Sequence, residues 1–385
     1  MTSYKGDLNL VRKINKGLVL NMVKKHGTIS RVEISRNSRL SRTAVSDIVS
    51  ELLNERLVRE EGLLNFSKVG RRPSMLRFNP EAYYIATGDF GETYAVTLGI
   101  VNLTGEVKER LEVTVDTKEE KERIFDNFAE NIYKLLDKLS LDKDKILGIG
   151  VAFPGEFNHE DGISIFSPNY HWRNVPVRDL IEKKTGIKTF VDNDARLKAL
   201  GEYLYGGGRG ANNLVYIGIS NGIGSGIILN GNLYRGSHYA SGEIGHCQIA
   251  SDGPKCGCGH HGCLGSVASG RAILYQVRTA IKEGKKTIIS DYAGSEGDGL
   301  TIDHIFQAAQ EKDGFASQVV KNVGSYIGMA LAYVMNTLDP DVVLLGGYVI
   351  EKGGESLLEI IKEVAAEKVF DISSYRTTRI EQAVL

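Results

Sequence analysis

One pattern of strands and glycine-rich turns occurs twice in this chain, more than 100 residues apart. Residues 83–115 read as three strands joined by tight turns, and residues 212–236 read as three strands joined by a glycine-rich turn and an Asn-Gly turn. A third glycine turn follows a buried strand and precedes a helix within residues 341–350. Residues 124–139 have the spacing of an amphipathic helix, and residues 146–157 read as a buried strand that ends in a Pro-Gly turn. We therefore expect an α/β protein with two similar halves that face each other across a cleft.

Polar side chains collect at the ends of these strands and in the loops. Asn169 lies in a loop, and Asn193 and Asp194 separate a strand from a helix. Glu243 and His246 lie between glycines. A polyhydroxylated ligand needs such groups, because each hydroxyl both donates and accepts a hydrogen bond. Glycine turns also let backbone N–H groups approach a phosphate. Each feature taken alone is more often a helix cap, a surface-loop residue or an ordinary turn, and no turn matches the P-loop or dinucleotide fingerprint.

The charge of the chain is unevenly distributed. The net charge is −1 at pH 7, yet residues 1–80 hold 16 Lys and Arg against 7 Asp and Glu, and the remainder holds 31 against 41. A basic N-terminal segment favours a polyanionic partner such as nucleic acid, although a well-solvated basic domain would have the same composition. No apolar run approaches the ~20 residues of a membrane helix, and the first residues show no apolar signal segment. We expect a cytoplasmic protein that contacts no membrane.

The basic segment has the pattern of a winged helix-turn-helix domain. Ser30 and Glu33 form a capping box at the start of a short helix, and Ser41 is a suitable N-cap for a second helix with one apolar face. Residues 57–60 then read as a strand, followed by a turn that begins at Gly62. In this fold the start of the second helix enters the major groove of DNA, although the same fold can instead bind protein. The candidates for DNA contact there are Ser41, Arg42, Thr43, Ser46 and Asp47.

A second candidate for DNA contact follows in residues 68–82. Arg71 and Arg72 are adjacent cations on a glycine-flanked segment, which suits a narrow minor groove or the flanking phosphates. A solvated linker is an equally good interpretation. We expect the domain boundary here, because the sequence pattern changes directly afterwards. The predicted domains are a winged helix-turn-helix with its linker at 1–80, a first α/β lobe at 81–195, and a second α/β lobe with the metal site and an oligomerisation surface at 196–385.

All four cysteines lie within seventeen residues of one another, accompanied by three histidines. Clustered thiols in a reducing compartment indicate metal or redox chemistry rather than a disulfide framework. Cys256-Gly-Cys258 is a poor match for a C-x-x-C redox pair and favours a structural zinc ion, which takes four thiolate or imidazole ligands in a tetrahedron. The candidate ligands are His246, Cys247, Cys256, Cys258, His260, His261 and Cys263.

Several of these stretches, in this order, resemble the signature of the ROK family (repressors, open reading frames and kinases), a branch of the actin/hexokinase-like fold. They are SPN…WRNVP at 167–176, VDNDA at 191–195 and GEIGHCQIASDGPKCGCGHHGCLG at 242–265. The N-terminal SRVEIS, LSRTAVSDIVSELL and GRRP resemble the winged-helix head that the family's sugar repressors carry and its plain kinases lack. The resemblance implies an α/β protein with an N-terminal winged helix-turn-helix followed by an actin/hexokinase-like two-lobed ROK domain.

The resemblance also implies a role for each matching residue. It leaves Cys247 out of the metal site and makes the zinc ligands His246, Cys256, Cys258 and Cys263. The residues that it places around a sugar are Asn169, Asn193, Asp194, Glu243 and His246. His246 would then use one nitrogen for zinc and direct the other toward the sugar. In the family's kinases, the residue matching Asp194 is the general base. The residues that match phosphate-binding turns are Asp89, Gly91, Thr93, Gly222, Gly224 and Gly347.

The three turns depart from the kinase pattern where phosphate would approach. Kinases of the family usually read D-x-G-G-T, G-T-G-I-G and three successive glycines, and here Glu92, Asn221 and Tyr348 interrupt these turns. Glu92 places a side chain where a triphosphate needs bare N–H groups. On the sugar side, Gly265 stands where the family commonly has a glutamate, so one carboxylate contact is missing. We therefore expect a vestigial phosphate site beside a working sugar site.

These observations favour a sugar-responsive transcriptional repressor of carbohydrate-utilisation genes. It would bind operator DNA through the head and a monosaccharide effector in the cleft. Because operators are usually two-fold, we expect a homodimer or a tetramer. The alternative is an ATP- and Mg²⁺-dependent hexose or N-acetylhexosamine kinase that uses Asp194 as its base. A purely structural zinc protein is disfavoured, because the polar loop residues converge on one cleft in the family's fold.

Overall fold

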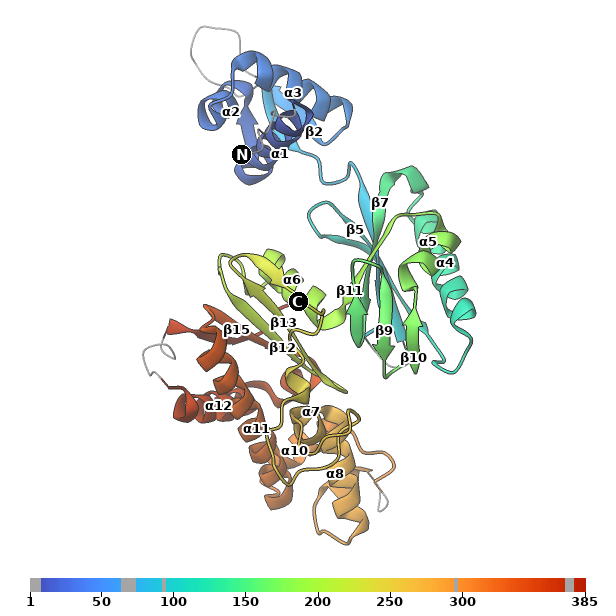
Figure 1. Ribbon diagram of the computed structural model, residues 1–385, viewed down its shortest axis with the longest axis vertical. Helices are drawn as coiled ribbons and strands as arrows, with labels where there is room; N and C mark the ends of the chain where they lie inside the picture. Colours follow the sequence, from blue (N-terminus) through green and yellow to red (C-terminus); the bar gives the residue numbers. More distant parts are fainter. Residues whose placement is uncertain (1–7, 64–73, 92–94, 294–296, 371–376) are drawn as a thin grey trace.

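The chain forms an N-terminal head, a first lobe and a second lobe (Figure 1). The computed structural model describes residues 8–63, 74–91, 95–293, 297–370 and 377–385. We use "head" for residues 8–78, "first lobe" for residues 84–193 and "second lobe" for residues 194–385. None of the helices in the described ranges has the length and apolar character that a membrane span requires.

The head is a winged helix-turn-helix domain with its own apolar core. Its helices are α1 (Leu8–His26), α2 (Arg31–Ser38) and α3 (Arg42–Asn54), and its strands, in sheet order, are β1 (Thr28–Ser30), β3 (Ser74–Phe78) and β2 (Val58–Leu63). Both predicted helix starts are confirmed: Ser30 and Glu33 form the capping box, and Ser41 Oγ accepts a hydrogen bond from the Ala44 N–H at 3.1 Å. Val45, Ile48 and Leu76 belong to the core that joins helices and sheet.

Two details of the wing differ from the sequence-based prediction. Gly62 does not begin a turn; it lies within β2, where the register shifts between Glu61 and Leu63, and glycine accommodates such an irregularity. Strand β3 was expected to be part of a linker, yet it pairs with both β1 and β2 and is the central strand of the sheet. The sequence SMLRF is too short to show a clear strand period, which explains the error. The predicted DNA contacts Arg71 and Arg72 lie outside the described residues.

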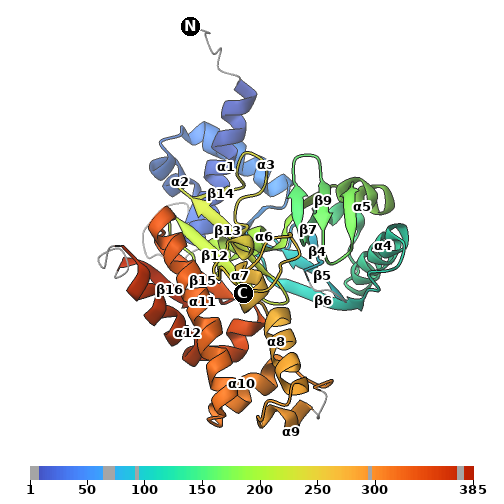
Figure 2. The ribbon, with the colours of Figure 1, turned by 60° about the horizontal axis from the view of Figure 1, so that its bottom comes forward.

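The first lobe contains a five-stranded sheet with helices on its outer side. The strand order is β11 (Thr189–Asn193), β7 (Ile146–Phe153), β4 (Tyr84–Asp89), β5 (Ala95–Asn102) and β6 (Val107–Thr114). Helices α4 (Lys121–Lys138) and α5 (Val177–Thr185) lie away from the second lobe (Figure 1 and Figure 2). A small sheet of β8 (Glu156–Asn158), β9 (Ile163–Ser167) and β10 (Trp172–Val175) completes the lobe. An aromatic cluster that includes Phe90, Phe153 and Trp172 fills its core.

The second lobe repeats the strand order of the first. Its sheet runs β14 (Asn232–Tyr234), β13 (Ile223–Leu229), β12 (Leu214–Ile219), β15 (Val342–Gly346) and β16 (Arg379–Gln382). In each sheet the first three strands in sequence form an antiparallel meander, and two later strands add in parallel. Its main helices are α8 (Gly270–Lys282), α10 (Ile302–Gln310), α11 (Gly314–Leu338) and α12 (Tyr348–Lys368). The two-lobed α/β fold expected from the repeated pattern is confirmed.

Helix α6 (Asp194–Tyr205) connects the two lobes. It begins directly after β11 of the first sheet and packs on β12 and β13 of the second. The approach to β13 is close: a Cβ added at Gly226 would lie 2.5 Å from the Ala199 Cβ, so only glycine fits there. At the other end of the helix, a Cβ at Gly105, in the β5–β6 turn, would lie 3.7 Å from the Tyr205 ring. Helix α6 therefore contacts both lobes along its length.

The segment that joins head and first lobe is hydrogen-bonded at both ends. Asn79 Nδ2 donates to the Arg56 carbonyl at 2.9 Å, which attaches the segment to the head. Glu81 Oε1 accepts from Asn102 Nδ2 at 2.8 Å and pairs with Lys108 Nζ at 2.7 Å, which attaches it to the β5–β6 hairpin. Asn102 is 1% exposed, and its Oδ1 accepts from the N–H groups of Thr104 and Glu106. The orientation of the linker therefore depends on the structure of this turn.

Candidate functional site

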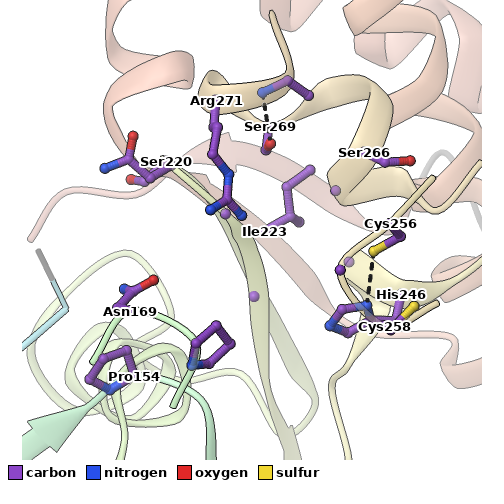
Figure 3. Close-up of a pocket in the computed structure, with 18 of the residues that line it drawn as sticks. Pro154, Asn169, Ser220, Ile223, His246, Cys256, Cys258, Ser266, Ser269 and Arg271 are labelled. Atoms are coloured by element: carbon purple, nitrogen blue, oxygen red, sulfur yellow. Dashed lines mark hydrogen bonds between the residues drawn. The ribbon is translucent and has the colours of Figure 1, made fainter. Parts of the chain in front are cut away.

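A cleft of about 2180 Å³ lies between the two lobes. The residues assigned to a sugar site by resemblance all line it: Asn169, Asn193, Asp194, Glu243 and His246. They come from loops and strand ends of both lobes that are up to 77 residues apart in sequence. Figure 3 shows Pro154 and Asn169 of the first lobe opposite Ser220, Ile223 and Arg271 of the second. The structure therefore brings the predicted residues together in one cavity.

Asp194 lies at the first turn of α6, beside a second carboxylate and a lysine. A Cβ added at Gly91 would lie 3.0 Å from Asp89 Oδ1 and 3.2 Å from Asp194 Oδ2, so both carboxylates lie close to this glycine. Lys198 Nζ is 3.9 Å from Asp194 Oδ2. Burial raises the pKa of Asp194, the positive charge of Lys198 opposes this shift, and the negative charge of Asp89 adds to it. A carboxylate with a raised pKa is a better proton acceptor than a free one.

Asn193 has a structural role in addition to its place in the cleft. Its Oδ1 accepts from the Arg196 N–H at 3.1 Å, which caps α6, and its Nδ2 donates to the Gly155 carbonyl at 3.0 Å. An amide side chain has two donor hydrogens and two acceptor lone pairs. One of each is therefore used by the protein, and one of each remains for a ligand.

Glu243 directly precedes a single turn of 3₁₀ helix, Ile244–His246, in the second lobe, and His246 is the last residue of that turn. Burial raises the pKa of the Glu243 carboxyl, and the neighbouring His246 and Arg196 oppose the shift. His246 Nδ1 lies 3.6 Å from Cys256 Sγ, and His246 also lines the cleft (Figure 3). The imidazole therefore contacts the cysteine cluster through Nδ1 and borders the cavity.

The four ligands implied by the resemblance form one cluster: His246, Cys256, Cys258 and Cys263, whose ligand atoms all lie within 4.8 Å of one another. Cys258 Sγ and Cys263 Sγ are 3.7 Å apart. Two thiolates bound tetrahedrally at about 2.3 Å from an ion would be about 3.8 Å apart, and a thiolate and an imidazole nitrogen about 3.6 Å. The cluster can thus hold a tetrahedral metal ion. Cys247 is not part of it: its thiol is exposed, and its backbone bonds to Ile244 and Leu264.

Glycines of the predicted phosphate-binding turns also border the cleft. Two residues that depart from the kinase pattern in these turns, Asn221 and Tyr348, are hydrogen-bonded to each other. Gly91, Gly222 and Gly224 line the cavity. Gly347 has a φ of 87° and leaves no room for a Cβ, which would lie 2.5 Å from the Ile219 carbonyl. Tyr348 Oη donates to Asn221 Oδ1 at 3.1 Å. Thr93 and Glu92 lie outside the described residues.

Sequence reasoning missed Arg271, which lies in the first turn of α8 and lines the cleft. Its side chain extends toward the cavity near Ser220 and Ile223 (Figure 3). The only sequence signal was its place two residues after Ser269, the N-cap of α8.

The predicted DNA-facing residues lie at the start of α3. Arg42, Thr43, Ser46 and Asp47 are exposed, and Ser41 caps the helix. Among the described residues of the head, some cations are ion-paired and others are not. Arg12, Lys16, Arg31, Arg59 and Arg77 pair with glutamates of the head. Around the α2–α3 turn, Arg36, Arg39 and Arg42 are exposed and form no ion pair with any described residue. Arg36 and Arg39 were not among the predicted contacts.

The fold and cleft define a class of protein: a winged helix-turn-helix head on a body with the two-lobed architecture of sugar kinases. The chain belongs to the ROK family, whose model matches residues 86–385. It is 32% identical over 381 residues to the xylose repressor of Caldicellulosiruptor bescii, covering 99% of this chain and 94% of that protein. It is 34% identical over 282 residues to the glucokinase of Thermotoga maritima, covering 72% of this chain and 86% of the kinase. Among solved structures, a ROK family transcriptional regulator homologous to the Escherichia coli Mlc protein matches with a TM-score of 0.84 at 29% identity, covering 97% of this chain and 92% of the other.

Proposed function

We propose that this chain is a sugar-responsive transcriptional repressor of carbohydrate-utilisation genes. The observation that carries the proposal is the contrast within one cleft. The sugar-side residues line the cavity, whereas Tyr348 and Asn221 are hydrogen-bonded across two turns that a nucleotide's phosphates would need. The exposed, unpaired arginines of the head supply the cationic surface that DNA binding requires.

The head is the operator-binding part. Arg42, Thr43 and Ser46 face base edges in the major groove, and Arg36 and Arg39 contact backbone phosphates. By sequence alone, Arg71 and Arg72 are further candidates for contact with the minor groove or the flanking phosphates. Two heads bind a two-fold operator as a homodimer or a tetramer, because symmetric half-sites need two copies.

The cleft binds a monosaccharide. Asn169, Asn193 and Asp194 bond its hydroxyls from one side, and Glu243 and His246 from the other. The ligand set of His246, Cys256, Cys258 and Cys263 fits zinc by donor type and spacing. Zinc would hold the loop rigid and orient His246, whose Nδ1 faces the cysteines. The remaining nitrogen then faces the sugar.

Sugar and operator are coupled ligands. If the sugar favours a lobe arrangement that binds the operator less well, the operator must weaken sugar binding by the same factor. Fluorescence anisotropy with a labelled DNA fragment from upstream of this chain's own gene tests the proposal. We expect binding at about 10⁻⁸ M or tighter, weakened about 10-fold or more by one monosaccharide of a panel. Operator binding that no sugar alters would contradict the sensing role.

A sugar kinase is the second candidate, and Asp194 is the observation that favours it. Its carboxyl lines the cleft with a raised pKa beside Lys198, as a proton-accepting base would. Coupled ADP-release assays with hexoses, N-acetylhexosamines and Mg-ATP decide between the two. Sugar-dependent turnover that disappears in Asp194→Asn would replace the repressor assignment with an enzyme.

A further inference from the structure

A buried ionic cluster lies next to the candidate sugar residues without lining the cleft. Asp192, near the end of β11, has a side chain only 6% exposed, and Arg196 in α6 only 2%. Asp192 Oδ2 accepts from Arg235 Nε at 2.8 Å, and Asp192 Oδ1 lies 3.4 Å from Arg196 Nη1. Buried ion pairs are weak sources of stability, because desolvation offsets most of their attraction. The cluster therefore needs an explanation other than stability alone.

The cluster joins a loop of the second lobe to the first lobe. We call residues 235–242 the clasp loop; it connects β14 to the 3₁₀ turn that carries His246. On the second-lobe side, Ser225 Oγ donates to the Gly242 carbonyl at 2.7 Å. On the first-lobe side, Arg235 Nε donates to Asp192 Oδ2. Arg196 of the connecting helix α6 donates to the Tyr239 carbonyl. The clasp loop is thus held from both sides of the cleft.

The backbone of the clasp loop is strained where it meets Arg196. Tyr239 has a φ of 58°, in the left-handed region that a tyrosine rarely adopts. Its ring packs edge-on to His159 of the first lobe, with centroids 5.2 Å apart. Such strain persists only where surrounding contacts hold it. The conformation of the clasp loop therefore depends on its contacts outside the second lobe.

Four of the proposed sugar-binding residues lie close in sequence to the Asp192–Arg235 pair or to the clasp loop. Asn193 and Asp194 follow Asp192 in sequence, and Glu243 follows the clasp loop. We propose that Asp192 is a positioning residue for the sugar: it holds the clasp loop against the first lobe and so brings Glu243 and His246 opposite Asn193 and Asp194. The proposal rests on the proposed sugar site and adds a residue that acts on the ligand only through others.

The test compares Asp192→Asn, Arg235→Gln and the double variant in the full chain. Asp303→Asn is the control, because it breaks an exposed ion pair of the second lobe, with Lys352 at 2.7 Å. Hydrogen–deuterium exchange of residues 235–246 is measured without ligand. Calorimetry gives Kd for whichever of D-xylose, D-glucose and N-acetyl-D-glucosamine stabilises the wild type most. We expect each single variant to raise both the exchange rate and Kd by about 10-fold or more, the double variant to add little, and the control to change neither.

The outcomes separate the positioning role from a structural one. A lower melting temperature with unchanged Kd overturns the proposal, as does unchanged exchange in the clasp loop. If Asp192→Asn does not fold, Arg235→Gln tests the positioning role instead, because the Arg235 side chain is only half-buried and its loss is better tolerated. If none of the three sugars binds the wild type, the proposed function fails for these sugars, and the exchange measurement still decides whether Asp192 holds the loop.

Discussion

At the scale of single residues, Tyr348 lies in a turn whose sequence departs from the pattern of the family's kinases. Its hydroxyl bonds Asn221, and a Cβ added at Gly270 would lie 1.9 Å from that hydroxyl oxygen. Gly270 therefore provides the space that Tyr348 occupies. Asn221 and Tyr348, which both depart from the kinase pattern, are thus hydrogen-bonded to each other, and Tyr348 is packed against Gly270.

Removing this pair should reopen the phosphate turns. We expect the wild type to bind a non-hydrolysable ATP analogue no better than millimolar, and Asn221→Thr/Tyr348→Gly to bind it at least about 10-fold more tightly, since bare N–H groups then face the phosphates. Isothermal titration calorimetry measures both. Tyr333→Ala, at an exposed tyrosine of α11, is the control. Tight binding to the unaltered protein would disprove this account of the cleft.

The two kinds of cysteine should respond differently to substitution. Cys258→Ser removes one of four ligands, so we expect bound zinc to fall from about one ion per chain to a small fraction, and sugar affinity to drop roughly 10-fold as His246 loses its orientation. Cys247→Ser, outside the cluster, should keep both. Atomic emission spectrometry and calorimetry make the comparison. Equal metal loss in both variants would contradict the ligand assignment.

The raised pKa of Asp194 predicts a pH-dependent cost to stability. A carboxyl whose folded-state pKa is raised binds its proton more tightly when folded, so the free energy of unfolding falls as pH rises from the unfolded pKa through the folded one. Asp194→Asn should therefore have a higher melting temperature than the wild type at pH 7. The difference should be about 2–4 °C for each kcal/mol by which the ionised carboxyl lowers the free energy of unfolding, and it should vanish near pH 4. Melting curves between pH 4 and 8 test this.

At the scale of secondary-structure elements, local signals predicted α2, α3, α4, α6 and α12 and the strands within residues 83–115, 146–157 and 212–236. Helices α8, α10 and α11 were not predicted. The capping box at Ser30, the N-cap at Ser41 and the strands and tight turns of residues 83–115 depend on neighbours in sequence, so they can be predicted from the sequence alone. Strand β3 could not be predicted in this way, because its five residues become a strand only by pairing with β1 and β2. Tertiary pairing decides the state of such short segments.

Helix α3 and the turn before it should carry the DNA contacts. Arg42→Ala should weaken operator binding by about 1–3 kcal/mol and relax the preference for the operator sequence. Arg36→Ala should weaken binding to DNA of any sequence and reduce the slope of log K against log salt concentration by about 1. Arg12→Ala is the matched control, because Arg12 already pairs with Glu51. Anisotropy titrations at several salt concentrations measure these effects. Equal losses in all three variants would indicate a general charge effect instead.

At the scale of the whole molecule, the sequence predicted which residues lie in one site, but it did not predict the contacts between the lobes that hold those residues in place. The resemblance named Asn193, Asp194 and Glu243, and the structure places them around one cleft. It did not single out Asp192 or Arg235, because their pairing joins positions 43 residues apart across the lobes. Contacts of this kind appear only once both lobes are assembled.

The linker between head and body should carry the response to sugar. Glu81→Ala removes the bonds to Asn102 and Lys108, so the head loses its fixed orientation while both binding surfaces remain. We expect sugar and operator affinities measured separately to change less than about 3-fold, and the effect of sugar on operator affinity to fall toward none. Glu109→Ala, which breaks the pair with Lys138, is the control. If sugar still changes the operator affinity of Glu81→Ala as much as that of the wild type, the linker bonds of Glu81 do not transmit the response.

Helix α6 carries Asp194 at one end and, at the other, Tyr205 against the turn that holds the linker. Twelve helical residues make a rod about 18 Å long, and a tilt of about 10° displaces its far end by about 3 Å. That distance is comparable to the length of one hydrogen bond. A small rotation of α6 at the proposed sugar site is thus geometrically sufficient to exchange one set of linker hydrogen bonds for another.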